Sequence, residues 1–209
     1  MTLETYPSTS PKAALVLAHG AGAGQKHPFM VRFARGMAER HISTATFDFP
    51  YITAGRKVPD RAPVLEQAWR DALAAGHAAF NPLPLFIGGK SMGGRMASHI
   101  ASQGVGGVKG LVFLGYPLHP PGQLDKRRDA HLPAIVEPML FVQGSRDAFG
   151  TAADITKLLP SLKHAEVHEV TGGDHSFKVP GGKKKDDGLE AIMDTVAAWI
   201  VATARNKRP

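Results

Sequence analysis

The sequence contains no cysteine among its 209 residues. This absence excludes disulfide bridges, a thiolate nucleophile and any zinc site built on cysteine. Long apolar runs are also missing, because the longest one, Ala13–Ala18, is far too short to cross a bilayer. The amino terminus lacks both the basic start and the apolar stretch of a secretory signal. From these absences we expect a cytoplasmic protein without a membrane span.

Acidic residues are outnumbered by basic ones, with 18 Asp and Glu against 25 Lys and Arg and a formal net charge of +7. Such a balance favours acidic partners, nucleic acid included. The basic residues, however, stand in short dispersed clusters such as 126–128 and 183–185. They are not interleaved with the aromatic residues on which bases would stack. We therefore favour a solvated basic surface over a nucleic-acid site.

Short apolar runs bounded by glycine or proline alternate with amphipathic stretches along the whole chain. This alternation is typical of a parallel sheet covered by helices on both faces. The expected strands are Ala13–Ala18, Thr44–Phe47, Leu85–Ile87, Gly110–Leu114, Met139–Val142 and Ala165–Val170. The expected helices span 28–40, about 63–81, a stretch beginning after residue 91, 151–160 and 189–202. We expect one domain over 1–209, with an extended segment at 1–12 and a basic tail at 204–209.

The segment 88–94, GGKSMGG, has two interpretations. Its Gly-Lys-Ser resembles the end of a phosphate-binding P-loop, and its Gly-Lys-Ser-Met-Gly has the G-x-S-x-G spacing of a nucleophile elbow. A P-loop requires glycine where Pro84 stands, and the strand in between could not wrap around a phosphate. The elbow requires a strand before the serine and a helix after it, and both are expected here. Ser91 is therefore the candidate nucleophile, and we expect Lys90 to point away from it.

A serine hydroxyl needs a histidine base, and the histidine needs a carboxylate to fix its tautomer. In proteins with such an elbow, the acid and then the base follow the serine, each after a later strand. Asp147 follows the fifth expected strand, and His175 follows the sixth after two glycines. Asp174 is a rival acid, but a residue adjacent to the base generally points elsewhere. We therefore predict that Ser91, His175 and Asp147 act together.

Backbone amides are the expected donors to the oxyanion that attack by a serine creates. One is the N–H of Met92, directly after the serine, and the other comes from the loop after the first core strand. We assign the second donor to Ala21, with Gly22 as the alternative. His19, which begins the same loop, is interpreted as a residue that braces it.

The substrate-binding residues are expected where strands end near the serine. We predict that Tyr116, Pro117 and Leu118 line the mouth of the site together with Gly22. No metal and no cofactor are expected, because the segment 164–168 reads H-x-E-x-H and not the helical HExxH of zinc proteases. The lysines at 183–185 follow the expected base and could contact an anionic substrate, although solvated lysines are the more ordinary interpretation.

Together these motifs resemble the α/β-hydrolase superfamily from Ala13 to the last helix. The resemblance is carried by LVLAHGAGAG, FDFPY, GGKSMGGRMAS, GYPLHPPG, FVQGSRDAFG and GGDHSF. Within the superfamily, the chain is similar to the small, lidless dienelactone-hydrolase-like branch. It is also similar to a hydrolase-like family that includes testis-expressed proteins and a scaffold subunit of a chromatin acetyltransferase complex. Dienelactone hydrolases proper use a cysteine nucleophile, so the absence of cysteine argues against their substrate.

The resemblance implies a three-layer αβα sandwich, a reduced α/β-hydrolase fold with about six mostly parallel strands and no cap domain. The segment 115–138, where related enzymes insert a cap, is short, so the site should be open. We expect a serine hydrolase that cleaves an ester or thioester of a small or exposed acyl substrate, as a monomer or homodimer. The alternative is a non-catalytic interaction module of the same fold that docks through its basic surface.

Overall fold

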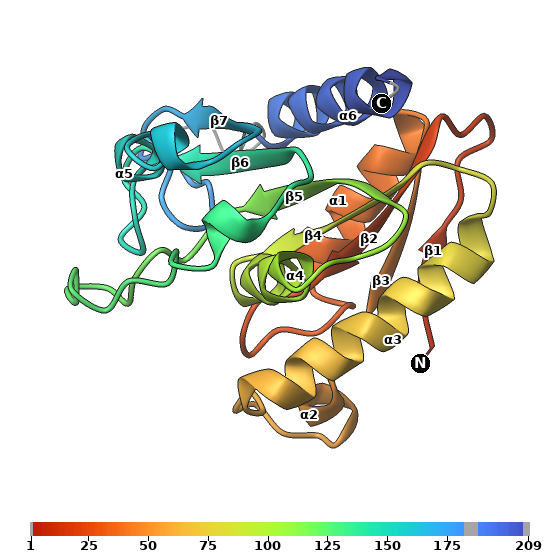
Figure 1. Ribbon diagram of the computed structural model, residues 1–209, viewed down its shortest axis with the longest axis horizontal. Coiled ribbons are helices and arrows are strands. Elements are labelled where there is room, and N and C mark those ends of the chain that lie inside the picture. The colour runs from red at the N-terminus through yellow and green to blue at the C-terminus, as the bar shows by residue number, and fades with distance from the viewer. Residues whose placement is uncertain (1, 182–187, 207–209) are drawn as a thin grey trace.

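The computed structural model of the protein describes residues 2–181 and 188–206. Its centre is a sheet of seven strands in the order β1-β3-β2-β4-β5-β6-β7 (Figure 1). The strands are β1 (Glu4–Tyr6), β2 (Ala13–Ala18), β3 (Ile42–Phe47), β4 (Leu85–Lys90), β5 (Val108–Leu114), β6 (Met139–Gly144) and β7 (Ala165–Val170). Neighbouring strands are parallel except for β1, which pairs antiparallel with β3.

The expected sheet of about six strands therefore gains a seventh, β1, within the segment 1–12. Its three residues, ETY, are too few to show an apolar pattern, and they hold their place through backbone pairing with β3. This pairing covers the edge that β3 would otherwise expose. The other six strands lie where the apolar runs predict them, and the mostly parallel sheet is confirmed.

Helices cover both faces of the sheet. They are α1 (Pro28–Glu39), α2 (Pro50–Thr53), α3 (Ala62–Phe80), α4 (Met92–Ser102), α5 (Ala152–Thr156) and α6 (Leu189–Arg205). One apolar cluster packs α1 and α6 against one face, and a second cluster packs α3 and α4 against the other (Figure 1). On the first face, Arg40 joins the two helices through ion pairs to Glu190 at 2.9 Å and Asp194 at 2.7 Å. The expected three-layer αβα sandwich is confirmed.

The connection from β5 to β6 is short, as expected for a fold without a cap. Within it lies one 3-10 turn, Leu132–Ala134, and a second such turn, Leu159–Ser161, follows α5. Among the described residues, no helix combines the length and the apolar character that crossing a bilayer requires. The lysines at 183–185 and the last three residues of the basic tail lie outside the described part of the chain.

The strand order places the candidate site. The chain runs from β2 outward to β3 and then returns to the opposite side of β2 to form β4. In open parallel sheets, ligands bind at the carboxyl ends of the strands where the order reverses in this way. The loop after β2 and the turn after β4 meet at this point.

Candidate active site

Ser91 stands between the last residue of β4 and the first residue of α4. Its backbone has φ 50° and ψ −116°, a left-handed region that residues other than glycine rarely enter. The Ser91 N–H is held by the carbonyl of Leu114 at 3.0 Å, at the end of the neighbouring strand β5. Strained backbone of this kind persists only where its surroundings fix it. The sharp turn lifts the hydroxyl of Ser91 above the carboxyl end of the sheet.

Gly93 lets this turn pass close to the loop after β2. A Cβ atom at this position would lie 2.6 Å from the carbonyl oxygen of His19 and 2.7 Å from the carbonyl carbon of Ala18. Because both obstacles are backbone atoms, neither could rotate away. The glycine thus places the elbow and the Ala18–Gly22 loop side by side.

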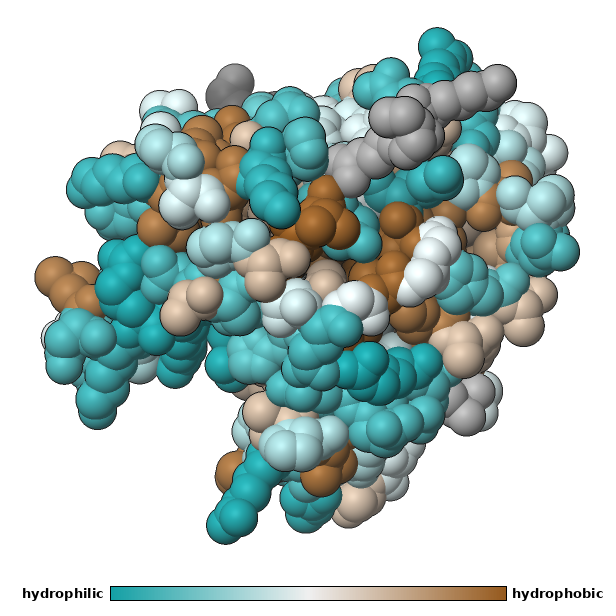
Figure 2. All heavy atoms as spheres, in the orientation of Figure 1, coloured by the Kyte–Doolittle hydropathy of each residue, from teal (hydrophilic) through white to brown (hydrophobic). Residues whose placement is uncertain are grey.

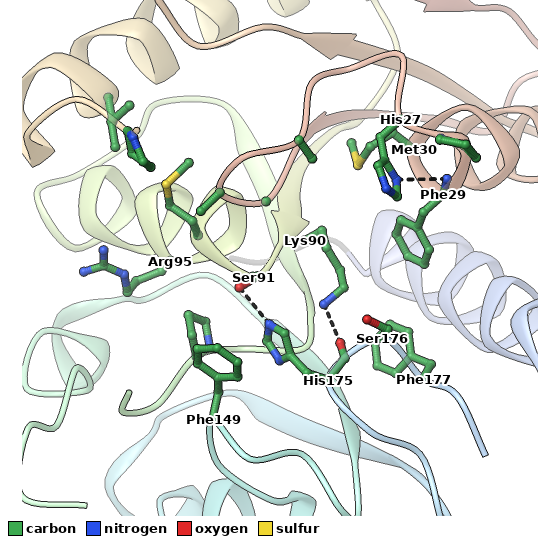
Figure 3. Close-up of a pocket in the computed structure, with 18 of the residues that line it drawn as sticks. His27, Phe29, Met30, Lys90, Ser91, Arg95, Phe149, His175, Ser176 and Phe177 are labelled. Atoms are coloured by element: carbon green, nitrogen blue, oxygen red, sulfur yellow. Dashed lines mark hydrogen bonds between the residues drawn. The ribbon is translucent and has the colours of Figure 1, made fainter. Parts of the chain in front are cut away.

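The structure brings Ser91, His175 and Asp147 into one chain of hydrogen bonds. The Oγ of Ser91 lies 2.8 Å from Nε2 of His175 (Figure 3). On the other side of the ring, Nδ1 lies 2.8 Å from Oδ2 of Asp147. A carboxylate can only accept, so Nδ1 carries the proton and Nε2 is left to accept one from the serine. This is the arrangement that general-base activation of a serine requires.

Asp147 is buried and held by further donors. Its Oδ1 accepts from the Phe149 N–H at 2.8 Å, and its Oδ2 accepts from Nε2 of Gln143 at 2.9 Å. Asp174, the rival acid, instead accepts from the backbone N–H groups of Ser176 and Lys178, at 2.8 and 2.9 Å. Asp174 therefore shapes its own loop, while Asp147 orients the histidine.

The predicted oxyanion donors are two backbone amides, one in the elbow and one in the loop after β2. The Met92 N–H is in the first turn of α4, where backbone donors have no partner within the helix. The described residues supply no hydrogen-bond partner for this N–H or for that of Ala21. The alternative donor, Gly22, is already engaged, because its N–H bonds the hydroxyl of Tyr51 at 3.3 Å. The geometry thus favours Ala21 over Gly22.

His19 braces the same loop, as the sequence predicts. Its ring is fully buried, with Nδ1 2.8 Å from the Gly20 carbonyl oxygen and Nε2 accepting from the Phe49 N–H at 3.2 Å. Burial holds the pKa of His19 below its ordinary value, against smaller opposing effects of the Gly20 carbonyl and Asp48. A neutral ring can donate to one partner and accept from the other, as these contacts require.

Lys90, which the sequence predicts to point away from Ser91, contacts the loop that carries the candidate base. Its ammonium donates to the backbone carbonyl of His175 at 2.6 Å and lies 5.3 Å from the centre of the Phe177 ring (Figure 3). Burial lowers the pKa of Lys90 to about 8, although Asp147 and Asp174 oppose this effect. Lys90 therefore holds the backbone of the candidate base.

A cavity of about 830 Å³ opens over Ser91 and His175. Its apolar walls come from the start of α1, with Phe29 and Met30, and from Phe177 (Figure 3). The opposite end is bounded by residues of the α2–α3 connection and of the segment 115–138. The outline of the molecule is notched between these two segments, at the lower left of Figure 2. No additional domain among the described residues covers this cavity.

Three of the four predicted lining residues do not line this cavity in the described part of the chain. Tyr116 and Leu118 are wrong predictions, because both side chains are buried in the core. The ring of Tyr116 packs against Phe113 and Phe141, with ring centres 5.4 and 5.6 Å away. Gly22 is also outside the lining, and Pro117 alone of the four contributes to it.

Sequence reasoning missed two residues that support the base. Gln143 is fully buried at the end of β6. Its Nε2 donates to Asp147, and its Oε1 accepts a hydrogen bond from the Tyr116 N–H at 2.7 Å. The sequence does contain a signal for Gln143: it is a polar residue near the end of an otherwise apolar strand, four residues before the candidate acid. Phe149 packs its ring 4.2 Å from that of His175, and nothing in the local sequence distinguishes it from a core residue.

Known proteins share this architecture. A family model described as "Alpha/beta hydrolase domain" matches residues 11–202. The fold is similar to that of a dienelactone hydrolase from Anabaena variabilis, with a TM-score of 0.76 and 18% identity over 97% of this chain and 92% of that one. It is also similar to Est1E from Butyrivibrio proteoclasticus solved with ferulic acid, with a TM-score of 0.75 and 14% identity over 98% and 96% of the two chains. A monoacylglycerol lipase from Paleococcus ferrophilus matches with a TM-score of 0.73 and 15% identity over 97% of this chain and all (100%) of that one. At these identities the likeness concerns the fold.

Proposed function

The chain belongs to the α/β-hydrolase family, and from this membership we propose that it is a serine hydrolase that cleaves carboxylic esters or thioesters. The observation that carries the proposal is the continuous hydrogen-bonded chain from Ser91 through His175 to Asp147. Esterases and a lipase among proteins of the same fold support the reaction class. Within the family, the lack of a cap in the described residues supports a place in the small, dienelactone-hydrolase-like branch.

The proposed reaction begins with proton transfer from Ser91 Oγ to Nε2 of His175. As the proton leaves, Oγ forms a bond to the substrate carbonyl carbon, and the carbonyl electron pair moves onto its oxygen. The N–H groups of Ala21 and Met92 donate to this oxyanion, and each such donor typically contributes about 10²–10³-fold to turnover. Asp147 stabilises the imidazolium without taking its proton.

The tetrahedral intermediate then collapses. The carbonyl re-forms, the bond to the leaving alkoxide or thiolate breaks, and His175 gives that group its proton. The acyl group stays on Ser91 until water, deprotonated by the same histidine, attacks its carbonyl carbon. The bond to Oγ then breaks, the acid is released, and His175 returns the proton to Oγ. Every group used belongs to the chain, so the proposal invokes no cofactor.

The open cavity supports small or exposed acyl substrates. Phe149 lies against His175, and the apolar wall formed by Phe29, Met30 and Phe177 can hold a short acyl or alcohol chain. A partner that presents an acyl group on its own surface could also reach Ser91, since none of the described residues form a covering domain. We therefore propose a small-molecule acyl compound as the first substrate class to test, with exposed acyl groups as the second.

The test compares hydrolysis of 4-nitrophenyl acetate and butyrate, and of an acyl thioester of N-acetylcysteamine, by wild type and Ser91→Ala. Alanine at this position meets the same backbone constraint as serine, so the folded structure is retained. We expect kcat/KM to fall at least about 10³-fold. Ser161→Ala, which changes an exposed serine, is the matched control and should leave the rate unchanged. If Ser91→Ala keeps the wild-type rate, the proposal is wrong and the interaction module is the better account.

A further inference from the structure

Arg95 lies one helical turn after Ser91, and its N–H donates to the Ser91 carbonyl at 3.0 Å. Side chains on a helix lean toward its amino terminus, so Arg95 shares the face of α4 that carries Ser91. Arg95 lines the cavity on the opposite side of Ser91 from Lys90 (Figure 3). Its Nε is buried with no hydrogen-bond partner. Within residues 2–181 and 188–206, no carboxylate forms an ion pair with its guanidinium.

Arg128 borders the same end of the cavity, although it comes from the segment 115–138. Its backbone is fixed on both sides. The Arg128 N–H donates to the Leu118 carbonyl at 2.9 Å, and its own carbonyl accepts from the hydroxyl of Tyr116 at 2.7 Å. Tyr116 and Leu118, which do not line the cavity, thus hold a residue that does. The described residues likewise provide no ion-pair partner for the Arg128 guanidinium.

The carboxylates around these arginines are already paired. Glu66 lies 2.9 Å from Nδ1 of His99, and Asp129 accepts from Arg127 at 2.7 Å. Burial, followed by the charge of Arg128, holds the pKa of Arg95 below its usual range, while Tyr116 and Glu66 have smaller opposing effects. The two guanidinium groups therefore repel each other, and neither has an ion-pair partner among the described residues.

The cavity as a whole is basic. Its described charged lining residues are Arg32, Lys90, Arg95, Arg128 and Lys178 against the single carboxylate of Asp60. Asp60 pairs through Oδ1 with Arg56 at 2.6 Å, and its buried Oδ2 has no partner among the described residues. A cleft lined mainly by one sign of charge concentrates ligands of the opposite sign.

We propose that Arg95 and Arg128 together bind an oxyanion, a carboxylate or a phosphate, on the ester or thioester that Ser91 attacks. Guanidinium groups bind both anions through paired N–H donors. An anion seated between them offsets the repulsion of the two arginines, because it places a negative charge beside both guanidinium groups. The inference rests on the proposed function and narrows its substrates to acidic esters, with Arg95 and Arg128 as specificity-determining residues.

The test compares anionic esters with neutral partners of similar size. 4-Nitrophenyl hydrogen adipate and 4-nitrophenyl hexanoate place the anion, or its neutral counterpart, on the acyl side. 4-Acetoxyphenyl phosphate and 4-acetoxybenzoate place a phosphate or a carboxylate on the leaving side, with 4-acetoxybenzamide as the neutral partner. In at least one series, we expect kcat/KM for the anionic ester to exceed that of its neutral partner by about tenfold or more, as a charge-assisted hydrogen bond would give. Added salt should reduce this ratio, because the site is open to solvent.

The ratio of anionic to neutral kcat/KM should fall to near one in Arg95→Gln and in Arg128→Gln. Arg128 lies on a surface segment, so its variant tests the site even if Arg95→Gln does not fold. Arg205→Gln, with the same loss of charge at an exposed position on α6, is the matched control and should keep the wild-type ratio. A wild-type ratio near one in both series, or equal losses for charged and neutral esters in the variants, would refute the oxyanion site while leaving the hydrolase function intact.

Binding is measured separately from turnover in Ser91→Ala protein, with adipate and inorganic phosphate as probes. We expect either anion to raise the Tm, and the rise to disappear when Arg95→Gln is added. If no ester is hydrolysed and the Tm still rises in this way, the anion site stands and the proposed function fails. If no ester is hydrolysed and neither anion changes the Tm, both the anion site and the proposed function are wrong.

Discussion

Replacing Lys90 by methionine removes a charge that the protein holds in a half-buried position. Burial lowers the pKa of this lysine from 10.5 to about 8 in the folded protein. Between these values the unfolded chain binds a proton that the folded protein does not, so the contribution of Lys90 to stability rises with pH across that window. The full shift corresponds to roughly 3 kcal/mol, of which about 2.5 kcal/mol develops between pH 7 and pH 10.

The assay is urea unfolding of wild type and Lys90→Met at pH 7 and pH 10. The free energy of unfolding of wild type minus that of the variant should increase by about 2.5 kcal/mol over this range, because other titrating groups cancel in the difference. Lys109→Met removes an exposed lysine from β5 and serves as the control, for which the difference should stay constant. A difference for Lys90→Met that is equally constant, or that falls with pH, would refute the account of Lys90 as a desolvated cation.

Three further predictions concern the acid, the elbow and a half-buried histidine. Asp147→Asn should lower kcat for 4-nitrophenyl butyrate by about 10²–10⁴-fold, whereas Asp174→Asn should cost far less, and the reverse order would exchange their roles. Gly93→Ala should lower the free energy of unfolding by about 2–3 kcal/mol in urea titration, because its Cβ would press on backbone oxygens. Burial, followed by the charges of His99 and Arg95, lowers the pKa of His131 from 6.5 to about 4. Between these pH values the unfolded chain binds a proton at this histidine that the folded protein does not. As pH falls from 6.5 to 4, the free energy of unfolding should therefore fall by roughly 1–2 kcal/mol more in wild type than in His131→Gln, and urea unfolding measures this difference. The figure is already reduced to allow for the partial exposure of His131.

The order of strands and helices could be predicted from the sequence because buried parallel strands leave unbroken apolar runs. The strands β2, β5 and β6 and the helices α1, α3, α4 and α6 show this signal or its helical counterpart. β1 shows none, since its three residues are held by backbone pairing to β3, which any side chains would allow. The short helix α2 likewise spans only four residues, fewer than a periodic pattern needs.

The positions of Ser91, Asp147 and His175 could be predicted because each follows a strand end in an order that the fold brings together. The residues that line the cavity could not be predicted, because the lining depends on which way a side chain points after the strand ends. Tyr116 turns into the core, where its ring packs on Phe113 and Phe141. Lys90 turns toward His175, a contact between residues 85 positions apart. Neither direction is encoded in local spacing.

The reactivity of Ser91 tests the central claim most directly. Folded protein is treated with a fluorophosphonate probe, and the modified residue is located by peptide mass spectrometry. The account predicts close to one label per chain, on Ser91, with strong loss of labelling in His175→Ala because the hydroxyl then lacks its base. Labelling that is absent from Ser91 in folded wild-type protein, or that is equally fast without His175, would contradict it.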